Sequence, residues 1–189
     1  MKKFVLPMMI ALFATIMFIN TPASAALVYD YNVETMIDRL YSETRKQRIN
    51  FFNKEYYVHN GARRCEIHYG ADNRDSLIRF RLDDNNNVQK ILISYIYKGT
   101  SDIDYSVMNA VEGMLILTLV FETMGLDVND YQSLKRANEG IDRIMSSKVV
   151  TADQYFHNKS TAWCPTIQRN ITFDVEFKNF VCDYYIYSE

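Results

Sequence analysis

The feature that most constrains this fold is a pair of short alternating runs joined by Asn60-Gly61, in the segment EYYVHNGARRCEIHYG. Asn-Gly is the strongest short signal for a β-hairpin, because a type I′ turn needs a positive φ at both of its central residues. Across this two-residue turn, Tyr56 falls opposite Cys65 or its neighbour. The segment therefore predicts two antiparallel strands with a defined register.

That register gives the hairpin one apolar and one polar face. The apolar face carries Tyr56, Val58, Cys65, Ile67 and Tyr69. The polar face carries Glu55, Tyr57, His59, Arg64, Glu66 and His68. This pattern is typical of an antiparallel strand pair that is buried on one side and open to solvent on the other.

A second hairpin is predicted in SLIRFRLDDNNNVQKILISYIY. Residues 78–82 alternate, with Arg79 and Arg81 on the polar side. Asp and Asn suit the turn at 84–87, because they tolerate left-handed backbone and hydrogen-bond to their own main chain. The same residues resemble the start of a calcium-binding loop, but Val88 stands where that loop needs glycine, so we expect an ordinary turn.

The C-terminal segment predicts a third hairpin. Residues 171–177 alternate between apolar and polar side chains, and Lys178-Asn179 is the predicted turn. Beyond the turn, four side chains return to the apolar face: Phe180, Cys182, Tyr184 and Ile186. About six strands are therefore expected in all.

Three segments have helical spacing. Residues 33–44 form an amphipathic helix with Asn32 as its N-cap. The apolar run 107–121 belongs to a buried helix over 101–125, and a further helical segment covers about 128–145. The order α-ββ-ββ-αα-ββ with short turns predicts an α+β domain, in which an antiparallel sheet packs against an N-terminal helix and a central helical pair.

The first 25 residues predict export. Two lysines precede an uncharged apolar run, and Ala-Ser-Ala at 23–25 is a small-residue cleavage site, as in a bacterial secretory signal peptide. A membrane anchor is the alternative, but Pro7 interrupts the run and no basic stop-transfer cluster follows. We therefore expect cleavage after residue 25, a secreted or periplasmic location, and a single domain over residues 26–189 without a stable membrane span.

Charge and motifs exclude several classes of function. Removal of residues 1–25 leaves 19 basic and 23 acidic residues, a formal net charge of about −4, which gives no overall attraction for nucleic acid. The sequence has no nucleotide-binding glycine motif, no nucleophile elbow and no zinc-protease motif, so no cofactor is predicted. His59 and His68 share a polar face, but two imidazoles do not complete a zinc site, and no metal is predicted.

The chain has three cysteines, at positions 65, 164 and 182. In an oxidising compartment Cys164–Cys182 is the favoured disulfide, although Cys65 paired with either of them stays open. Such a bridge typically contributes about 2–4 kcal/mol. A free Cys65 is expected in the core, and His68, three positions along the same strand, points to the other face, so the two do not form a catalytic pair.

One group of polar-face residues suggests a role. Tyr57, Arg64, His68, Arg79 and Arg81 form a tyrosine–arginine surface, and these two residue types dominate protein interfaces. The leading hypothesis is an exported, non-enzymatic protein that binds a partner protein or an extracytoplasmic ligand. An inhibitor or immunity-type protein that blocks an extracytoplasmic enzyme is the alternative, and an enzyme that uses Cys65 or a histidine is a third.

Overall fold

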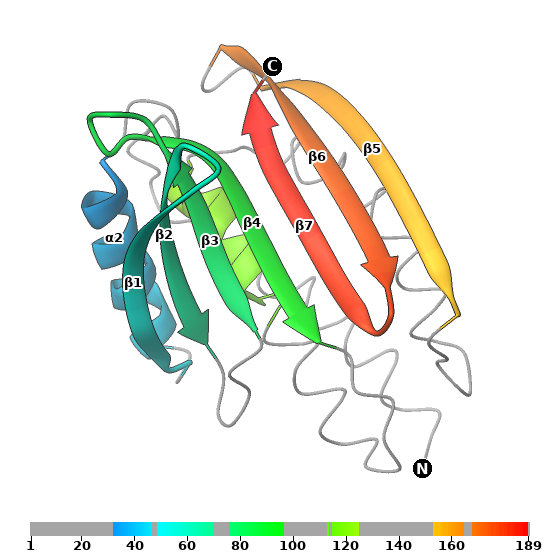
Figure 1. Ribbon diagram of the computed structural model, residues 1–189, viewed down its shortest axis with the longest axis horizontal. Coiled ribbons are helices and arrows are strands. Elements are labelled where there is room, and N and C mark those ends of the chain that lie inside the picture. Colours follow the sequence, from blue (N-terminus) through cyan, green and yellow to red (C-terminus); the bar gives the residue numbers. More distant parts are fainter. Residues whose placement is uncertain are drawn as a thin grey trace.

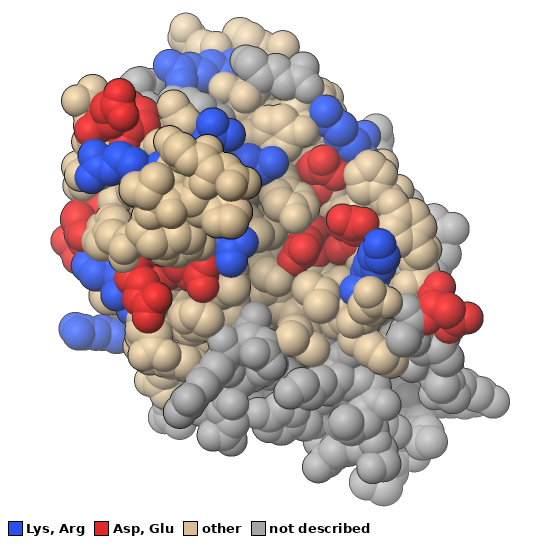
Figure 2. Space-filling model, viewed as in Figure 1, with Lys and Arg blue, Asp and Glu red and all other residues tan. Residues whose placement is uncertain are grey.

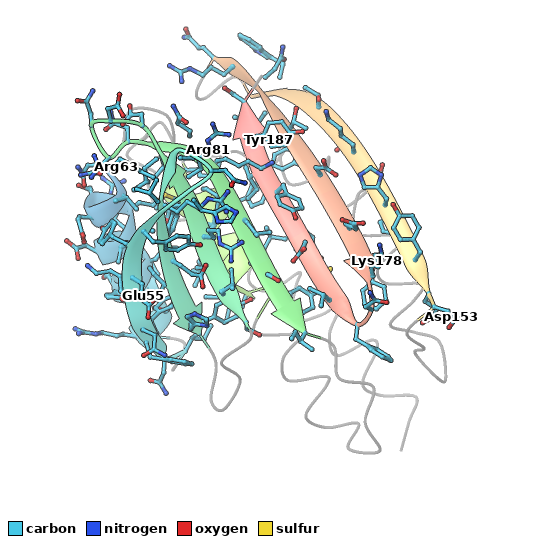
Figure 3. The ribbon with its side chains drawn as sticks, in the orientation of Figure 1. Glu55, Arg63, Arg81, Asp153, Lys178 and Tyr187 are labelled. Atoms are coloured by element: carbon cyan, nitrogen blue, oxygen red, sulfur yellow. The ribbon has the colours of Figure 1, made fainter. Side chains whose placement is uncertain are left out.

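The structure is a computed structural model of the chain. The residues described are 32–46, 49–69, 76–96, 113, 115–124, 153–164 and 168–188. The predicted signal peptide and the predicted helical segment at about 128–145 lie outside these residues. The described elements form one antiparallel sheet with helices against one of its faces (Figure 1). Figures 1 to 3 share one orientation, in which the sheet face away from the helices is turned to the viewer.

Within the described residues, seven strands make up the sheet, in the order β1-β2-β3-β4-β7-β6-β5, and each neighbouring pair is antiparallel. Their bounds are β1 Phe51–His59, β2 Ala62–Tyr69, β3 Leu77–Leu82, β4 Val88–Ile96, β5 Tyr155–Cys164, β6 Arg169–Lys178 and β7 Val181–Ser188. The broad prediction of an α+β fold is confirmed, whereas the predicted number of six strands is wrong. The sequence pattern missed β5, because its residues Tyr-Phe-His-Asn-Lys-Ser-Thr-Ala-Trp-Cys give neither face a continuous apolar stripe.

The first two hairpins have the predicted turns, and β2 and β3 alternate as predicted. On β1 the prediction is wrong for Tyr56 and Val58: both belong to the predicted apolar face but are exposed, because β1 is an edge strand with a neighbour on one side only. Asn60 and Gly61 have φ values of 51° and 71°, as a type I′ turn requires, and Tyr56 pairs with Cys65. In the turn between β3 and β4, the Asp83 carboxylate accepts the main-chain N–H of Asn87 at 2.7 Å. An acidic side chain that hydrogen-bonds to its own turn explains why the Asp/Asn-rich segment ends one strand and begins the next.

The last hairpin turns one residue later than predicted, at Asn179-Phe180, where φ is 51° and 64°. Phe177 consequently pairs with Cys182 rather than with Phe180. The register differs from the prediction by two residues, an even number, so Cys182, Tyr184 and Ile186 are nevertheless buried as predicted, whereas Phe180 lies in the turn and is only half-buried.

The inner face of the sheet packs against α2 (Val33–Lys46) and against a helix that includes residues 115–123. Asn32 caps α2 as predicted, since its Oδ1 accepts the N–H of Glu34 at 3.0 Å. Gly113 lies directly against the buried Tyr95 ring, where a Cβ atom would overlap the ring. Glycine therefore allows this second helix to approach the centre of the sheet closely.

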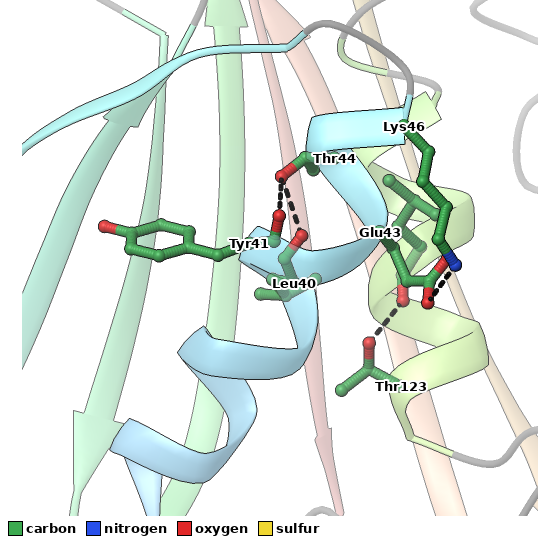
Figure 4. A network of polar contacts seen from close by, with 7 residues as sticks. Leu40, Tyr41, Glu43, Thr44, Lys46 and Thr123 are labelled. Atoms are coloured by element: carbon green, nitrogen blue, oxygen red, sulfur yellow. Dashed lines mark hydrogen bonds and ion pairs between the residues drawn. The ribbon is translucent and has the colours of Figure 1, made fainter.

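The two helices lie side by side on the inner face (Figure 4). Each has a threonine hydroxyl that donates to its own helix: Thr44 to the carbonyl of Leu40 and Thr123 to that of Leu119, both at 2.7 Å. Burial raises the pKa of Glu122 on the second helix, and the charge of Glu43 on α2 adds to the effect. Among the described helices, none has both the length and the apolar character needed to cross a membrane.

Candidate binding face

The face of the sheet opposite the helices, which we call the outer face, carries the five residues that the sequence singled out. No described helix covers this face, and Figure 2 shows cationic and anionic side chains interspersed on it. Its side chains come from alternate positions of all seven strands, and the register aligns them in rows that run across the strands.

One of these rows crosses the whole sheet. From β1 to β5 its members are Tyr57, Arg64, Arg81, Lys90, Tyr187, Thr172 and Thr161. Residues directly opposite each other on neighbouring strands have Cβ atoms about 4.5–5.5 Å apart. Three cations therefore occupy three adjacent strands, with a tyrosine at each end. We call Tyr57, Arg64, Arg81, Lys90 and Tyr187 the basic row; Figure 3 shows Arg81 and Tyr187 on this face.

The cations of the basic row differ in their surroundings. Arg81 is exposed, and no ion pair joins it to another described residue. The Nε atom of Arg64 is buried and has no hydrogen-bond partner. The Nζ atom of Lys90 lies 4.5 Å from the ring centroids of both Tyr185 and Tyr187. Burial lowers the pKa of Lys90; the negative charge of Asp174 opposes this fall, and the positive charges of Arg81 and Lys159 add to it.

The next row centres on Glu66, a residue to which the sequence assigned no role. Its Oε2 accepts hydrogen bonds from Tyr57 Oη at 2.9 Å and from Arg79 Nε at 2.7 Å, and its Oε1 lies 3.2 Å from His68 Nε2. Burial alone would raise the pKa of Glu66, but the hydrogen bonds from Arg79 and Tyr57 outweigh it, and the pKa is lowered. Three of the five predicted site residues thus converge on one carboxylate.

The other half of the outer face carries three carboxylates together with two exposed lysines, Lys159 and Lys178. Asp174 and Glu176 on β6 and Asp183 on β7 point outward, and His157 Nε2 lies 2.7 Å from Asp174 Oδ1. Asp183 is half-buried, and its Oδ1 has no hydrogen-bond partner. Burial raises the pKa of Asp183; the Ser94 hydroxyl opposes this rise and the charge of Glu176 adds to it. The alternation of β6 already placed Asp174 and Glu176 on the polar side, but their neighbours depend on strand order.

A cleft of about 430 Å³ adjoins the Tyr57 end of the basic row. It is lined by Asn32, Glu34, Tyr56, Tyr57, Val58, Arg63, Arg64 and Asn86. Glu34 accepts hydrogen bonds from Tyr56 and from Lys54, and these bonds lower its pKa. The carboxylate of this cleft is therefore already held by neighbouring side chains, whereas Arg64 contributes a cation from the basic row.

Cys65 and Cys182 are buried free thiols. Burial raises the pKa of both, that of Cys182 to about 12, so neither supplies a thiolate at neutral pH. Cys65 faces the core while His68 contacts Glu66 on the outer face, so the two are apart as predicted.

The structure does not bring Cys164 and Cys182 together. Cys164 pairs with Arg169 and Cys182 with Phe177, near opposite ends of β6, which corresponds to about 26 Å along the strand. Cys65 lies three strand spacings from Cys182, about 14 Å across the sheet, and Cys182 is also four residues along β7 from the position in line with Cys65. A disulfide requires Cα atoms within about 7 Å. The bridge between Cys164 and Cys182 stays a prediction, and this strand register does not support it.

Among the described residues, no group of three or more His, Cys, Asp or Glu side chains is placed to hold a metal ion. His59 lies next to the first turn, and His68 lies at the other end of β2. No family model, curated protein or solved structure matches this chain. Its function must therefore be inferred from its own residues.

Proposed function

We propose that this chain is an exported binding protein, without catalytic activity of its own, that recognises a partner protein through the outer face of its sheet. The support for export is the signal-peptide pattern of residues 1–25. The observation that carries the binding role is the outer face itself, which is seven strands wide, is covered by no described helix, and carries arginine and tyrosine side chains across its width.

The dimensions of the outer face fit a protein partner better than a small molecule. Six strand spacings give a width of about 29 Å, and a strand of eight residues is about 26 Å long. The resulting area of about 750 Å² approaches the roughly 800 Å² that each partner contributes to a standard protein interface.

Two buried polar atoms on this face have no partner within the described part of the chain. They are the Nε of Arg64 and the Oδ1 of Asp183, one in each half of the sheet. Buried polar atoms without a hydrogen bond are rare in native proteins, and each needs a physical reason. Because both atoms are buried, a bound protein would satisfy them only after the side chains of Arg64 and Asp183 rearrange toward the surface.

Truncation of the two outer-face tyrosines that flank Lys90 tests the proposal. The mature protein, immobilised through a C-terminal tag, is used to capture proteins from an extracytoplasmic extract of the source cells. Interface anchors of this type contribute about 2 kcal/mol or more, so Tyr185→Ala/Tyr187→Ala is expected to weaken capture at least about 30-fold.

The matched control is Asp38→Ala/Ser42→Ala, which alters the exposed side of α2 behind the sheet. Capture by the control is expected to equal that of the unmodified protein, and thermal melts establish that both variants are folded. Equal capture by the tyrosine variant, or no capture by the unmodified protein, would contradict the proposed function.

A further inference from the structure

We infer that the basic row binds carboxylate side chains, so that the partner protein presents an acidic segment to this part of the outer face. This inference rests on the proposed function and specifies its partner. The residues that contact the acidic segment are Arg64, Arg81 and Lys90, with Tyr57 and Tyr187 at the two ends of the row.

The first observation is that the basic row brings like charges together. Arg64 lies directly opposite Arg81, and Arg81 lies directly opposite Lys90. Like charges in directly opposed positions destabilise a sheet. No acidic residue stands in the row: the outward carboxylates of Glu55, Glu66 and Asp174 belong to the next row, and those of Glu176 and Asp183 to the row beyond it. An external anion would offset a repulsion that the row itself does not neutralise.

The second observation is that the cations differ in access but lie on one face. Arg81 is exposed, whereas Arg64 is half-buried and its Nε is buried without a partner, so Arg81 is the most accessible donor of the row. Lys90 is held by two tyrosine rings, an arrangement that keeps its charge while it fixes the position of the ammonium group. Guanidinium groups bind carboxylates through two parallel hydrogen bonds, so Arg64 and Arg81 suit acidic side chains in particular.

The third observation distinguishes an acidic protein segment from a long polyanion such as nucleic acid. The basic row is one residue deep along each strand, and the next outward position, about 6.6 Å away, carries Glu66 on β2 and Asp174 on β6, each opposite a cation, Arg79 and Lys159. A nucleic-acid backbone laid over this face would meet those carboxylates, and the mature chain has a formal net charge of about −4. A few carboxylates in a short segment match the narrow row.

Binding of a peptide of eight glutamates, labelled with fluorescein and followed by fluorescence anisotropy at low ionic strength, tests the inference on the mature protein. The variant is Arg81→Gln/Lys90→Gln. The control is Arg45→Gln/Lys178→Gln, which removes the same charge at exposed positions outside the row. We expect the unmodified protein and the control to bind within two-fold of each other, and the row variant to bind at least ten-fold more weakly.

Three results would overturn the inference: an octalysine peptide that binds as tightly as octaglutamate, equal losses in the row variant and the control, or tighter row-dependent binding to phosphatidylglycerol vesicles or to an oligonucleotide than to octaglutamate. The capture experiment keeps the two proposals apart. If capture is lost in Tyr185→Ala/Tyr187→Ala but equal in Arg81→Gln/Lys90→Gln and the unmodified protein, the outer face binds a protein. The acidic-segment inference is then wrong. If octaglutamate binds through the basic row but the unmodified protein captures no protein from the extract, the proposed function is contradicted, although the row binds carboxylates.

Discussion

Glu66 and Asp183 are both carboxylates on the outer face, one in each half of the sheet. Glu66 accepts hydrogen bonds from Arg79 and Tyr57, and these bonds outweigh its burial, so that its pKa is lowered. Asp183 has no cation within hydrogen-bonding distance among the described residues, and burial raises its pKa. The two positions differ chiefly in whether an arginine is within reach, and this decides the sign of the pKa shift.

The same comparison applies to the two halves of the chain. Each half has a helix followed by an antiparallel run of strands, and the last strands of the two runs, β4 and β7, pair at the centre. The first half has more cations than Glu66 requires, because Arg79 already holds that carboxylate. The second half concentrates its carboxylates on β6 and β7. Arg64, Arg81 and Lys90 are therefore the cations that remain available to a partner.

The largest expected effect is that of Glu66→Gln, which leaves the Arg79 guanidinium without its carboxylate. Hydrogen bonds to charged groups contribute about 1.5–3 kcal/mol, so the free energy of unfolding at pH 7 should fall by about 2 kcal/mol. Urea titration measures this change. Glu176→Gln is the matched control in the other half, where the carboxylate lies near Asp183, and it should produce no loss.

The pH dependence sharpens this prediction. Because the folded-state pKa of Glu66 is lowered, its stabilising effect is fully present above its unfolded pKa of about 4.3 and is lost as the pH falls through the folded value. The difference between Glu66→Gln and the unmodified protein should therefore shrink in strong acid. An equal difference at pH 7 and pH 3 would show that the ion pair with Arg79 is not its origin.

The hairpin turns offer a second comparison between the halves. Gly61 has a φ of 71° and open space where an added methyl group would stand, so Gly61→Ala should lower the free energy of unfolding by about 1 kcal/mol through backbone strain alone. At the other turn, Phe180→Gly relieves strain at a φ of 64° but removes a ring that packs on the core, so the two effects oppose each other. Thermal melts should show a larger change for Gly61→Ala; the reverse order would contradict the turn assignment.

Asp183→Asn should have a smaller effect of the opposite sign to Glu66→Gln. A raised folded-state pKa means that the ionised carboxylate destabilises the fold at neutral pH. This destabilisation is relieved as the pH falls from the raised folded-state pKa to the unfolded-state pKa of about 3.9. The variant should therefore melt at a higher temperature than the unmodified protein at pH 7 and at the same temperature below pH 4. A lower melting temperature at pH 7 would mean that Asp183 is neutralised by a cation.

A thiol count involves no change in stability and tests the register of the second half. The disulfide expected from the sequence leaves one free thiol per chain under denaturing, non-reducing conditions, whereas a register that keeps Cys164 and Cys182 near opposite ends of β6 implies three. A count of one would mean that a disulfide has formed and would require a different register for β5, β6 and β7.

Local patterns in the sequence predicted the inner face and most of the turns. Alternation placed Cys65, Ile67 and Tyr69 in the core, and helical spacing placed Leu40 there, because each pattern is set by residues close together in the chain. β5 was missed for the same reason. Its Asn158 and Ser160 stand on the side that faces Val175 and Phe173, so no apolar alternation marks it as a strand.

The binding face was only partly predictable, because its rows depend on strand order. Alternation identified Arg64 and Arg81 as outward-facing, but not that Arg79 is held by Glu66. Lys90 and Tyr187 were missed entirely, since they meet only because β4 pairs with β7, nearly one hundred residues later in the chain. No local pattern in the sequence specifies that pairing.

The central claim is that the cations of the basic row are not neutralised within the row and bind an acidic partner. The most direct test is Arg81→Gln, with its stability and its octaglutamate binding both measured on one preparation. Removal of the middle cation relieves two like-charge contacts, so the free energy of unfolding should stay the same or rise by a few tenths of a kcal/mol, up to about 1 kcal/mol, while the affinity for octaglutamate falls several-fold. Unchanged affinity, or a loss of stability that accompanies the loss of binding, would contradict the account.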